Sequence, residues 1–260
     1  MKVELIRYTP DALDLLLDTK ATRLRGKTAA EMNESEKYEH FQYMLDTIKS
    51  PFDFIDYVFD ITDVSKNFTH QLVRTRTGAY NQEAARAVNM AGAHIIEPEF
   101  NDANLDSIFA AAVHIADTAY QELIANGAAR QDARAVLPSN MATNIKAKFN
   151  LRTLSDMSKI RLCSRTQGEY QQVFRLMREA VLSVHPWAAP LLEVHCVAMG
   201  TCAFPNYGKV SCAFYRDWMD MTDKKAQLRE VFWMTEMQTS NPIAEGGMAL
   251  DTISGGKINA

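Results

Sequence analysis

The chain is poor in cysteine, and its few thiols do not follow a metal-binding pattern. Four cysteines occur among 260 residues. Without a secretory signal they are expected to be reduced rather than paired. His195, Cys196, Cys202 and Cys212 lie close in sequence, but their spacing is not a usual zinc spacing. We therefore expect buried free thiols and no metal site.

Long apolar runs are also missing. No segment approaches the roughly 18 apolar residues that a membrane helix needs, and the N-terminus lacks a signal-peptide pattern. These absences predict a cytoplasmic protein that does not bind membranes. Neither an internal repeat nor a linker rich in Pro, Gly or Ser divides the chain. With 47% hydrophobic residues, we expect one domain over residues 1–240 and a mobile tail over 241–260.

An excess of basic residues is absent as well. The formal net charge is −4 and the sequence pI is about 5.9, which argues against a nucleic-acid partner. Arginines are instead concentrated locally, where Arg74, Arg76 and Arg86 flank a turn of small residues at 77–79. Such a local concentration on an acidic protein predicts capture of a small anionic ligand.

The residue types around this turn suit a nucleotide. Guanidinium groups bind phosphate through two parallel hydrogen bonds. The carboxamides of Gln71, Asn81 and Gln82 offer a donor and an acceptor together, as the edge of a nucleobase requires. Gly78 is expected to let the backbone approach the ligand. The alternative is a solvated turn with salt bridges.

Local signals predict helices and strands in alternation. One helix is expected to start at Thr9-Pro10-Asp11, and another after Asn33, which has Glu36 three residues on. Residues 52–64 and 142–149 read as strands.

Three further helical regions are expected, at residues 101–126, 150–184 with a loosening at Gly168, and 215–239. In the first, apolar residues gather on one side, and Gly127 closes the helix. The pattern predicts one α/β domain with strands between long helices.

A second group of polar residues lies downstream. Arg134 precedes Pro138 by four residues, and Asn150, Arg152, Asp156 and Arg161 follow. All of them except Arg161 have a structural alternative: Asn150 as a helix cap, Arg152 and Asp156 as a surface ion pair, and Arg134 as compensation for a helix C-terminus.

Helix geometry gives a further expectation. Successive residues advance about 100°, so Arg152 and Asp156 share a face while Arg161 lies about 180° around. If all three are functional, the helix faces two pockets, which places the sites at subunit interfaces.

Together these segments resemble the flavin-dependent thymidylate synthases, the ThyX family. That family carries Arg-His-Arg, seven residues, then Ser, with an Arg two positions later and a Gln three before. Arg74-Thr75-Arg76, Ala84, Arg86 and Gln71 fall at those places. Thr75 replaces the histidine, and Ala84 replaces the serine.

Three downstream segments extend the resemblance over roughly residues 40–215. Arg134 lies in the family's Ala-Arg-x-x-Leu-Pro. Asn150 and Arg152 match its Asn-x-Arg, whereas Asp156 replaces a second Asn. Arg161 matches the arginine of a Leu-Arg pair. Ser50-Pro51-Phe52-Asp53-Phe54 is similar to the family's Thr-Pro-Phe-Glu-His.

The resemblance implies roles for individual residues. Arg161 is the implied catalytic residue, because it stabilises charge that develops on the pyrimidine. Residues implied for the nucleotide are Gln71, Arg74, Gln82, Glu83, Ala84, Ala85, Arg86, Arg134 and Arg161. Residues implied for FAD are Ser50, Arg74, Thr75, Arg76, Gln82, Asn150, Arg152 and Asp156. Gln82 replaces a glutamate that contacts both ligands in the family.

The implied function is C5 methylation of dUMP to dTMP. Methylenetetrahydrofolate would donate the carbon, reduced FAD the hydride, and NADPH the electrons. The resemblance also implies a homotetramer with interface active sites, and a single α+β domain with a central, mostly antiparallel sheet and long flanking helices. Because of Thr75, Gln82 and Ala84, two alternatives stay open. One is a paralogue acting on UMP or dCMP or transferring a hydroxymethyl group. The other is a catalytically silent nucleotide- or flavin-binding protein.

Overall fold

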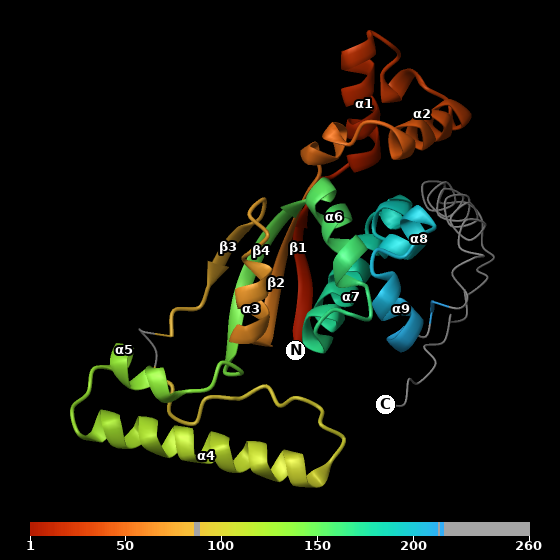
Figure 1. The fold of residues 1–260 in the computed structure, drawn as a ribbon. Coiled ribbons are helices and arrows are strands. Elements are labelled where there is room, and N and C mark those ends of the chain that lie inside the picture. Colours follow the sequence, from red (N-terminus) through yellow and green to blue (C-terminus); the bar gives the residue numbers. More distant parts are fainter. Residues whose placement is uncertain (86–88, 213, 216–260) are drawn as a thin grey trace, which may run out of the picture.

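The computed structural model describes residues 1–85, 89–212 and 214–215 (Figure 1). Arg86, the helix predicted at 215–239 and the tail predicted at 241–260 fall wholly or almost wholly outside these residues. Among the described residues, no helix combines the length and the apolar character needed to cross a membrane. The cytoplasmic location stays a prediction.

A four-stranded antiparallel sheet forms the centre of the molecule, as the resemblance implied. Its strands are β1 (Lys2–Tyr8), β2 (Asp56–Ser65), β3 (Ala79–Gln82) and β4 (Ala142–Asn150), in the order β1-β2-β4-β3. The main register places Asp56 opposite Asn150 and Ile61 opposite Ile145. Alternate residues of β4 are buried, because successive side chains of a strand point to opposite faces.

Helices cover one face of the sheet and extend beyond both of its ends (Figure 1). Four helices lie together on the covered side of the sheet. They are α6 (Leu151–Arg161), α7 (Gly168–Leu182), α8 (His195–Met199) and α9 (Pro205–Ser211). Beyond one end lie α1 (Ala12–Leu24) and α2 (Glu34–Asp46), and beyond the other lie α4 (Ala103–Ala125) and α5 (Arg130–Ala133). The short helix α3 (Lys66–Leu72) follows β2 directly. The 3-10 helices are η1 (Ala29–Glu31), η2 (Ser50–Phe54), η3 (Arg134–Val136) and η4 (Pro186–Leu191).

The predicted start of α2 is confirmed in detail. The Asn33 side chain accepts a hydrogen bond from the Glu36 amide at 3.0 Å, and the Glu36 carboxylate accepts one from the Asn33 amide at 2.9 Å. This is a capping box, which satisfies two amides left over at a helix start. The strand predicted at 52–64 is corrected at its beginning, because Pro51 opens the turn η2 before β2 begins.

The long helix predicted at 150–184 is in fact two helices. The first, α6, ends at Arg161, and α7 starts at Gly168. The Leu162 and Cys163 amides bond back to carbonyls of Ser158 and Ile160, as at an ordinary helix end. The separation therefore places Arg161 at a helix C-terminus.

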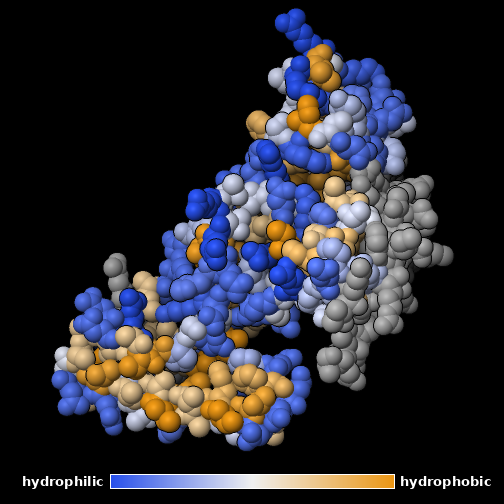
Figure 2. Space-filling view, in the orientation of Figure 1, coloured by the Kyte–Doolittle hydropathy of each residue, from blue (hydrophilic) through white to orange (hydrophobic). Residues whose placement is uncertain are grey.

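The apolar side predicted for α4 exists, but it does not pack into the core. Ile108 and Ile115 on this side are 59% and 68% exposed, whereas Tyr120 on the neighbouring face is buried. Leu105 and Leu123 are exposed as well. Figure 2 shows the resulting apolar surface along this helix. Periodicity identified the stripe correctly, but within one chain nothing in the described residues covers it.

Candidate active site

A pocket of about 570 Å³ lies where η2, the loop after α3 and helix α6 meet. The residues that line it are Asp53, Thr75, Thr77, Arg152, Thr153, Asp156, Met157, Ile160 and Arg161. Of the residues singled out in the sequence, the pocket thus brings together Thr75, Arg152, Asp156 and Arg161. Its volume lies in the range typical of small-molecule sites.

Asn150 and Arg152 converge on one carboxylate at the start of α6. The Asn150 amide donates to Asp53 Oδ1 at 2.9 Å, and Arg152 Nη1 donates to Asp53 Oδ2 at 3.0 Å. Asn150 also caps the helix, because its Oδ1 accepts from the Thr153 amide at 2.8 Å. Asp53 therefore joins η2 to Asn150 and Arg152, the two residues for which the resemblance implied contact with FAD.

The ion pair considered between Arg152 and Asp156 is not formed. Asp156 instead accepts from Lys159 at 2.8 Å. The expectation that Arg161 faces a different pocket from Arg152 is also wrong, since both line the same one. The lining residues of α6 run from Arg152, near the start of the helix, to Arg161 at its end.

Arg161 is half-buried and lies over an aromatic ring. Its guanidinium carbon is 4.3 Å from the centre of the Tyr170 ring, which belongs to the first turn of α7. Such a cation–π contact stabilises a guanidinium without neutralising its charge. A positive charge thus remains available at the wall of the pocket.

Tyr80 holds the Arg74-Thr75-Arg76 loop through hydrogen bonds to backbone carbonyls. The Tyr80 hydroxyl donates to the carbonyl oxygens of Thr75 at 2.6 Å and Leu72 at 3.1 Å. Burial raises the pKa of this hydroxyl to about 12. The loop is joined to α6 by a 3.0 Å hydrogen bond from Thr153 Oγ1 to Thr77 Oγ1. Arg74 and Arg76 are exposed and do not line the pocket.

Gly78 has a packing role that the sequence did not indicate. A Cβ atom there would lie 2.4 Å from the Tyr80 hydroxyl oxygen and 2.6 Å from a ring carbon of Phe149. The absence of a side chain therefore serves contact with β3 and β4. The predicted approach of a ligand to this backbone is not needed to explain the glycine.

Of the residues predicted for the nucleotide, Arg161 lines the pocket, and Arg86 lies outside the described residues. The others do not line it: Gln71, Arg74, Gln82, Glu83, Ala84, Ala85 and Arg134. Gln82 Nε2 donates to Thr69 Oγ1 at 3.0 Å, and Gln71 Nε2 donates to Gln167 Oε1 at 3.1 Å. Ala84 is exposed and Ala85 is buried.

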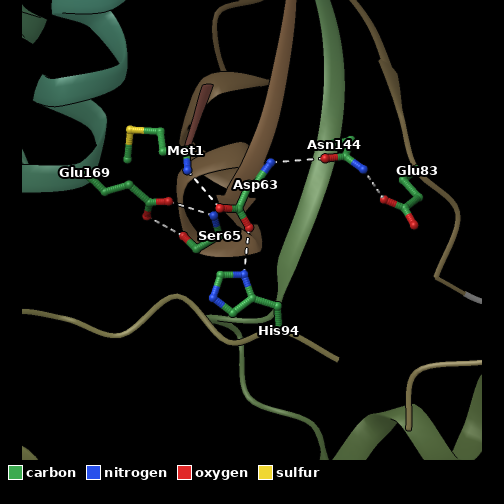
Figure 3. Close-up of polar contacts among 7 residues, drawn as sticks. All are labelled: Met1, Asp63, Ser65, Glu83, His94, Asn144 and Glu169. Atoms are coloured by element: carbon green, nitrogen blue, oxygen red, sulfur yellow. Dashed lines mark hydrogen bonds and ion pairs between the residues drawn. The ribbon is translucent and has the colours of Figure 1, made fainter. Parts of the chain in front are cut away.

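Glu83 belongs to a polar network. Its carboxylate accepts from Asn144 Nδ2 at 2.9 Å, and Asn144 Oδ1 accepts from the Asp63 amide at 3.0 Å (Figure 3). Asp63 in turn contacts His94 at 2.7 Å. Nearby in the same view, Glu169 of α7 accepts from the Ser65 amide at 2.6 Å and from its hydroxyl at 2.5 Å. These last bonds join α7 to the start of α3.

Lys66 is a candidate that the sequence analysis missed. Burial lowers the pKa of its ammonium group, the positive charge of Arg134 lowers it further, and Glu83 opposes the shift. Lys66 and Arg134 therefore lie close enough to repel each other, an arrangement that an anion would relieve. No motif marked Lys66, because its proximity to Arg134, 68 positions further along the chain, follows from the fold.

Arg134 also fits its structural alternative. It caps the C-terminus of α5, and its Nε donates to the Gln131 carbonyl at 3.1 Å. Ser50 begins η2 and is exposed, but it does not line the pocket. The four cysteines are free and half-buried. In the described part of the chain, no three acidic, histidine or cysteine side chains are arranged to hold a metal ion.

Comparison with known proteins gives a consistent result. Residues 4–187 match the family model described as thymidylate synthase complementing protein. The flavin-dependent thymidylate synthase of Clostridium tetani is 32% identical over 209 residues, which is 72% of this chain and 84% of that protein. Proteins of the same name from Sulfolobus acidocaldarius and Pyrococcus abyssi are 29% and 27% identical. They cover 75% and 86% of this chain, and the matches span 79% and 99% of their own lengths.

An antiparallel sheet flanked by long helices, with a pocket lined in part by arginine and threonine side chains, defines an α+β protein with a candidate ligand site. The family match extends over well more than half of the sequence. The chain therefore belongs to the thymidylate synthase complementing protein family, whose curated relatives are named flavin-dependent thymidylate synthases.

Proposed function

We propose that the protein is a flavin-dependent thymidylate synthase that methylates C5 of dUMP with methylenetetrahydrofolate. The observation that carries the proposal is the pocket itself, in which Thr75, Arg152, Asp156 and Arg161 converge. These residues come from two family segments that are far apart in sequence. Their convergence in one pocket supports a shared ligand for both segments.

The pocket suits part of an FAD molecule. Arg152 uses one nitrogen on Asp53, which leaves further N–H groups for ribityl or phosphate oxygens. Thr75 and Thr77, from the loop after α3, add hydroxyls to the lining. Asn150 would act through the helix start that it caps, and Ser50, Arg74 and Arg76 would extend the site at its rim. Bound FAD would supply the hydride and carry the one-carbon unit, with NADPH as the proposed reductant.

Arg161 would act on the pyrimidine ring. Negative charge must grow on the uracil O2–N3 edge as C5 becomes nucleophilic. A fixed cation beside that edge stabilises the charge with little reorganisation. Arg161 offers such a cation, because the Tyr170 ring holds it without a counter-charge. No nucleophilic side chain is required, so Ala84 is compatible with this chemistry.

Lys66 and Arg134 would hold the phosphate of the nucleotide. Lys66 interacts electrostatically with both Arg134 and Glu83, and the repulsion between the two cations favours an anion between them. The neighbouring Gln71 and Gln82 carboxamides suit the nucleobase or the sugar, and Arg86 would add a further cation.

A homotetramer with shared active sites follows as part of the proposal. The phosphate residues lie outside the pocket that contains Arg161, so a complete site would combine surfaces of different copies. The exposed apolar side of α4 supplies a surface that association would bury (Figure 2). Association through such a stripe is the usual way to cover it.

The decisive experiment is a turnover assay on the purified protein. With dUMP, methylenetetrahydrofolate, FAD and NADPH we expect dTMP, identified by its mass. Parallel reactions with UMP and dCMP test the alternative that the protein is a paralogue that acts on another pyrimidine nucleotide. If the protein binds FAD but forms no product from any of the three nucleotides, the synthase and the paralogue are excluded. The remaining hypothesis is then a catalytically silent flavin-binding protein. Protein that neither turns yellow nor binds FAD would contradict the flavin site itself.

A further inference from the structure

Arg161 is held differently from the other arginine of the pocket. Arg152 is neutralised by the Asp53 carboxylate at 3.0 Å. Within residues 1–85, 89–212 and 214–215, Arg161 forms no ion pair, and its guanidinium lies 4.3 Å from the centre of the Tyr170 ring. The position of this guanidinium therefore depends on an aromatic face rather than on a carboxylate.

Tyr170 is a rigid platform for that contact. Its side chain is fully buried, and the ring packs edge to face against Phe68 with the ring centres 5.0 Å apart. The preceding residue, Glu169, accepts two hydrogen bonds from Ser65. The first turn of α7 is thus fastened to α3, and the ring has little freedom to move.

The hydroxyl of Tyr170 lies close to two residues that line the pocket. It approaches the side chains of Thr75 and Arg161 without the full geometry of a hydrogen bond to either. Burial raises its pKa, and Arg161 and Thr75 oppose the shift. The ring therefore stays neutral at physiological pH, as a cation–π contact requires. Tyr170 itself does not line the pocket.

We propose that Tyr170 is a positioning residue for the reaction, whose ring face holds the Arg161 guanidinium where charge develops on the pyrimidine. This inference rests on the proposed function. It assigns to α7 a part in turnover that requires no contact between Tyr170 and either ligand.

The test separates the electrostatic effect of the ring from its volume. Tyr170→Phe keeps the aromatic ring. Replacement of Tyr170 by 3,5-difluorophenylalanine or 3,4,5-trifluorophenylalanine progressively removes the negative charge of the ring face at nearly constant volume. We expect kcat to fall stepwise along this series, by a total on the order of 10-fold. The KM for the nucleotide and the affinity for FAD should change less than 3-fold. Tyr170→Leu, which removes the face, should lower kcat at least as far.

The chain offers a matched control. Arg165 lies over the Phe204 ring at the same 4.3 Å distance, and neither residue lines the pocket. Fluorination of Phe204, or Phe204→Leu, should leave kcat unchanged. In an Arg161→Ala background the Tyr170 series should have no further effect on kcat, because the ring would act only through that arginine.

Two outcomes would overturn the inference. One is a trifluoro variant that is folded, loaded with FAD and as active as the Phe variant. The other is a fall in kcat that persists unchanged in the Arg161→Ala background. Failure of the parent protein to convert any uracil nucleotide would instead refute the proposed function, so the two failures are distinguishable.

Discussion

Arg161 and Arg134 occupy different surroundings, and we expect different effects from removing them. Arg161 faces charge that grows during the reaction, so Arg161→Ala should lower kcat by on the order of 10²-fold. Arg134 lies beside Lys66 at the proposed phosphate site, so Arg134→Ala should chiefly raise the KM for the nucleotide. Steady-state kinetics on both variants measures the two effects. Equal losses in kcat for both would show that the roles are wrongly divided.

Asp53 is the residue on which the flavin side of the pocket depends. It accepts hydrogen bonds from Asn150 and Arg152, so Asp53→Asn should loosen both and raise the Kd for FAD. The pair is partly exposed, so we expect about 1 kcal/mol, or roughly 5-fold. Quenching of flavin fluorescence gives the Kd.

Glu4→Gln is the control for this change, because it removes a surface ion pair with Lys2 at 2.9 Å outside the site. Glu4→Gln should leave FAD binding unchanged. Equal affinities for all three proteins would show that Asp53 does not organise the pocket.

At the scale of elements, the junction of β2 and η4 contains a buried histidine. His185 is 6% exposed, and its Nδ1 is 2.9 Å from the Tyr57 hydroxyl. Burial lowers the pKa of His185 from 6.5 to about 4. The neutral form is therefore favoured by folding, and its contribution is fully present above pH 6.5 and is lost as the pH falls toward 4.

Because of His185, we expect the free energy of unfolding to fall by about 3 kcal/mol when the pH is lowered from 7 to 4. Urea denaturation across this range measures the loss, and His185→Gln should make the dependence shallower. The exposed His70 provides the control, since His70→Gln should not alter the slope. A His185→Gln profile parallel to the parent's would contradict the assignment.

Elements defined by local chemistry could be predicted from the sequence, and those defined by distant partners could not. The capping box of Asn33 and Glu36 fixes the start of α2 within four residues. The strands β1 and β3 were missed, because β1 pairs with β2 at separations of 49 to 60 residues and β3 has only four residues. The break between α6 and α7 was underestimated because neither proline nor glycine occurs in residues 162–167, although the helix ends at Arg161.

The same distinction applies to the site. Motif spacing identified Thr75, Arg152, Asp156 and Arg161, which the fold brings into one pocket. Asp53 was visible only as part of a motif, because its two hydrogen bonds join residues nearly 100 positions apart. Lys66 emerged from its proximity to Arg134, which no spacing reveals. Contacts between side chains that are distant in sequence became visible only in the three-dimensional structure.

For the whole molecule, the exposed stripe of α4 predicts the effect of a charge placed on it. Ile115→Asp should weaken self-association, because a buried carboxylate without a partner is costly at an interface. Light scattering at micromolar concentration should show smaller species, with turnover lost alongside. His114→Asp is the control, since its exposed side chain points about 100° away around the helix. A tetramer that survives Ile115→Asp would place the interface elsewhere.

The first turn of α7 has a consequence for how this sequence can change length. Glu169 fastens the start of α3, and Tyr170, the next residue, supports Arg161 at the end of α6. Only residues 162–167 separate Arg161 from this turn. One inserted or deleted residue there would rotate α7 or shift it, and both contacts would be lost together. Among the residues that the structure describes, the turn around Gly127, between α4 and α5, makes no such pair of contacts and should accept an added residue. Length variation among relatives is therefore expected in that turn, while the six-residue connection between α6 and α7 keeps its length.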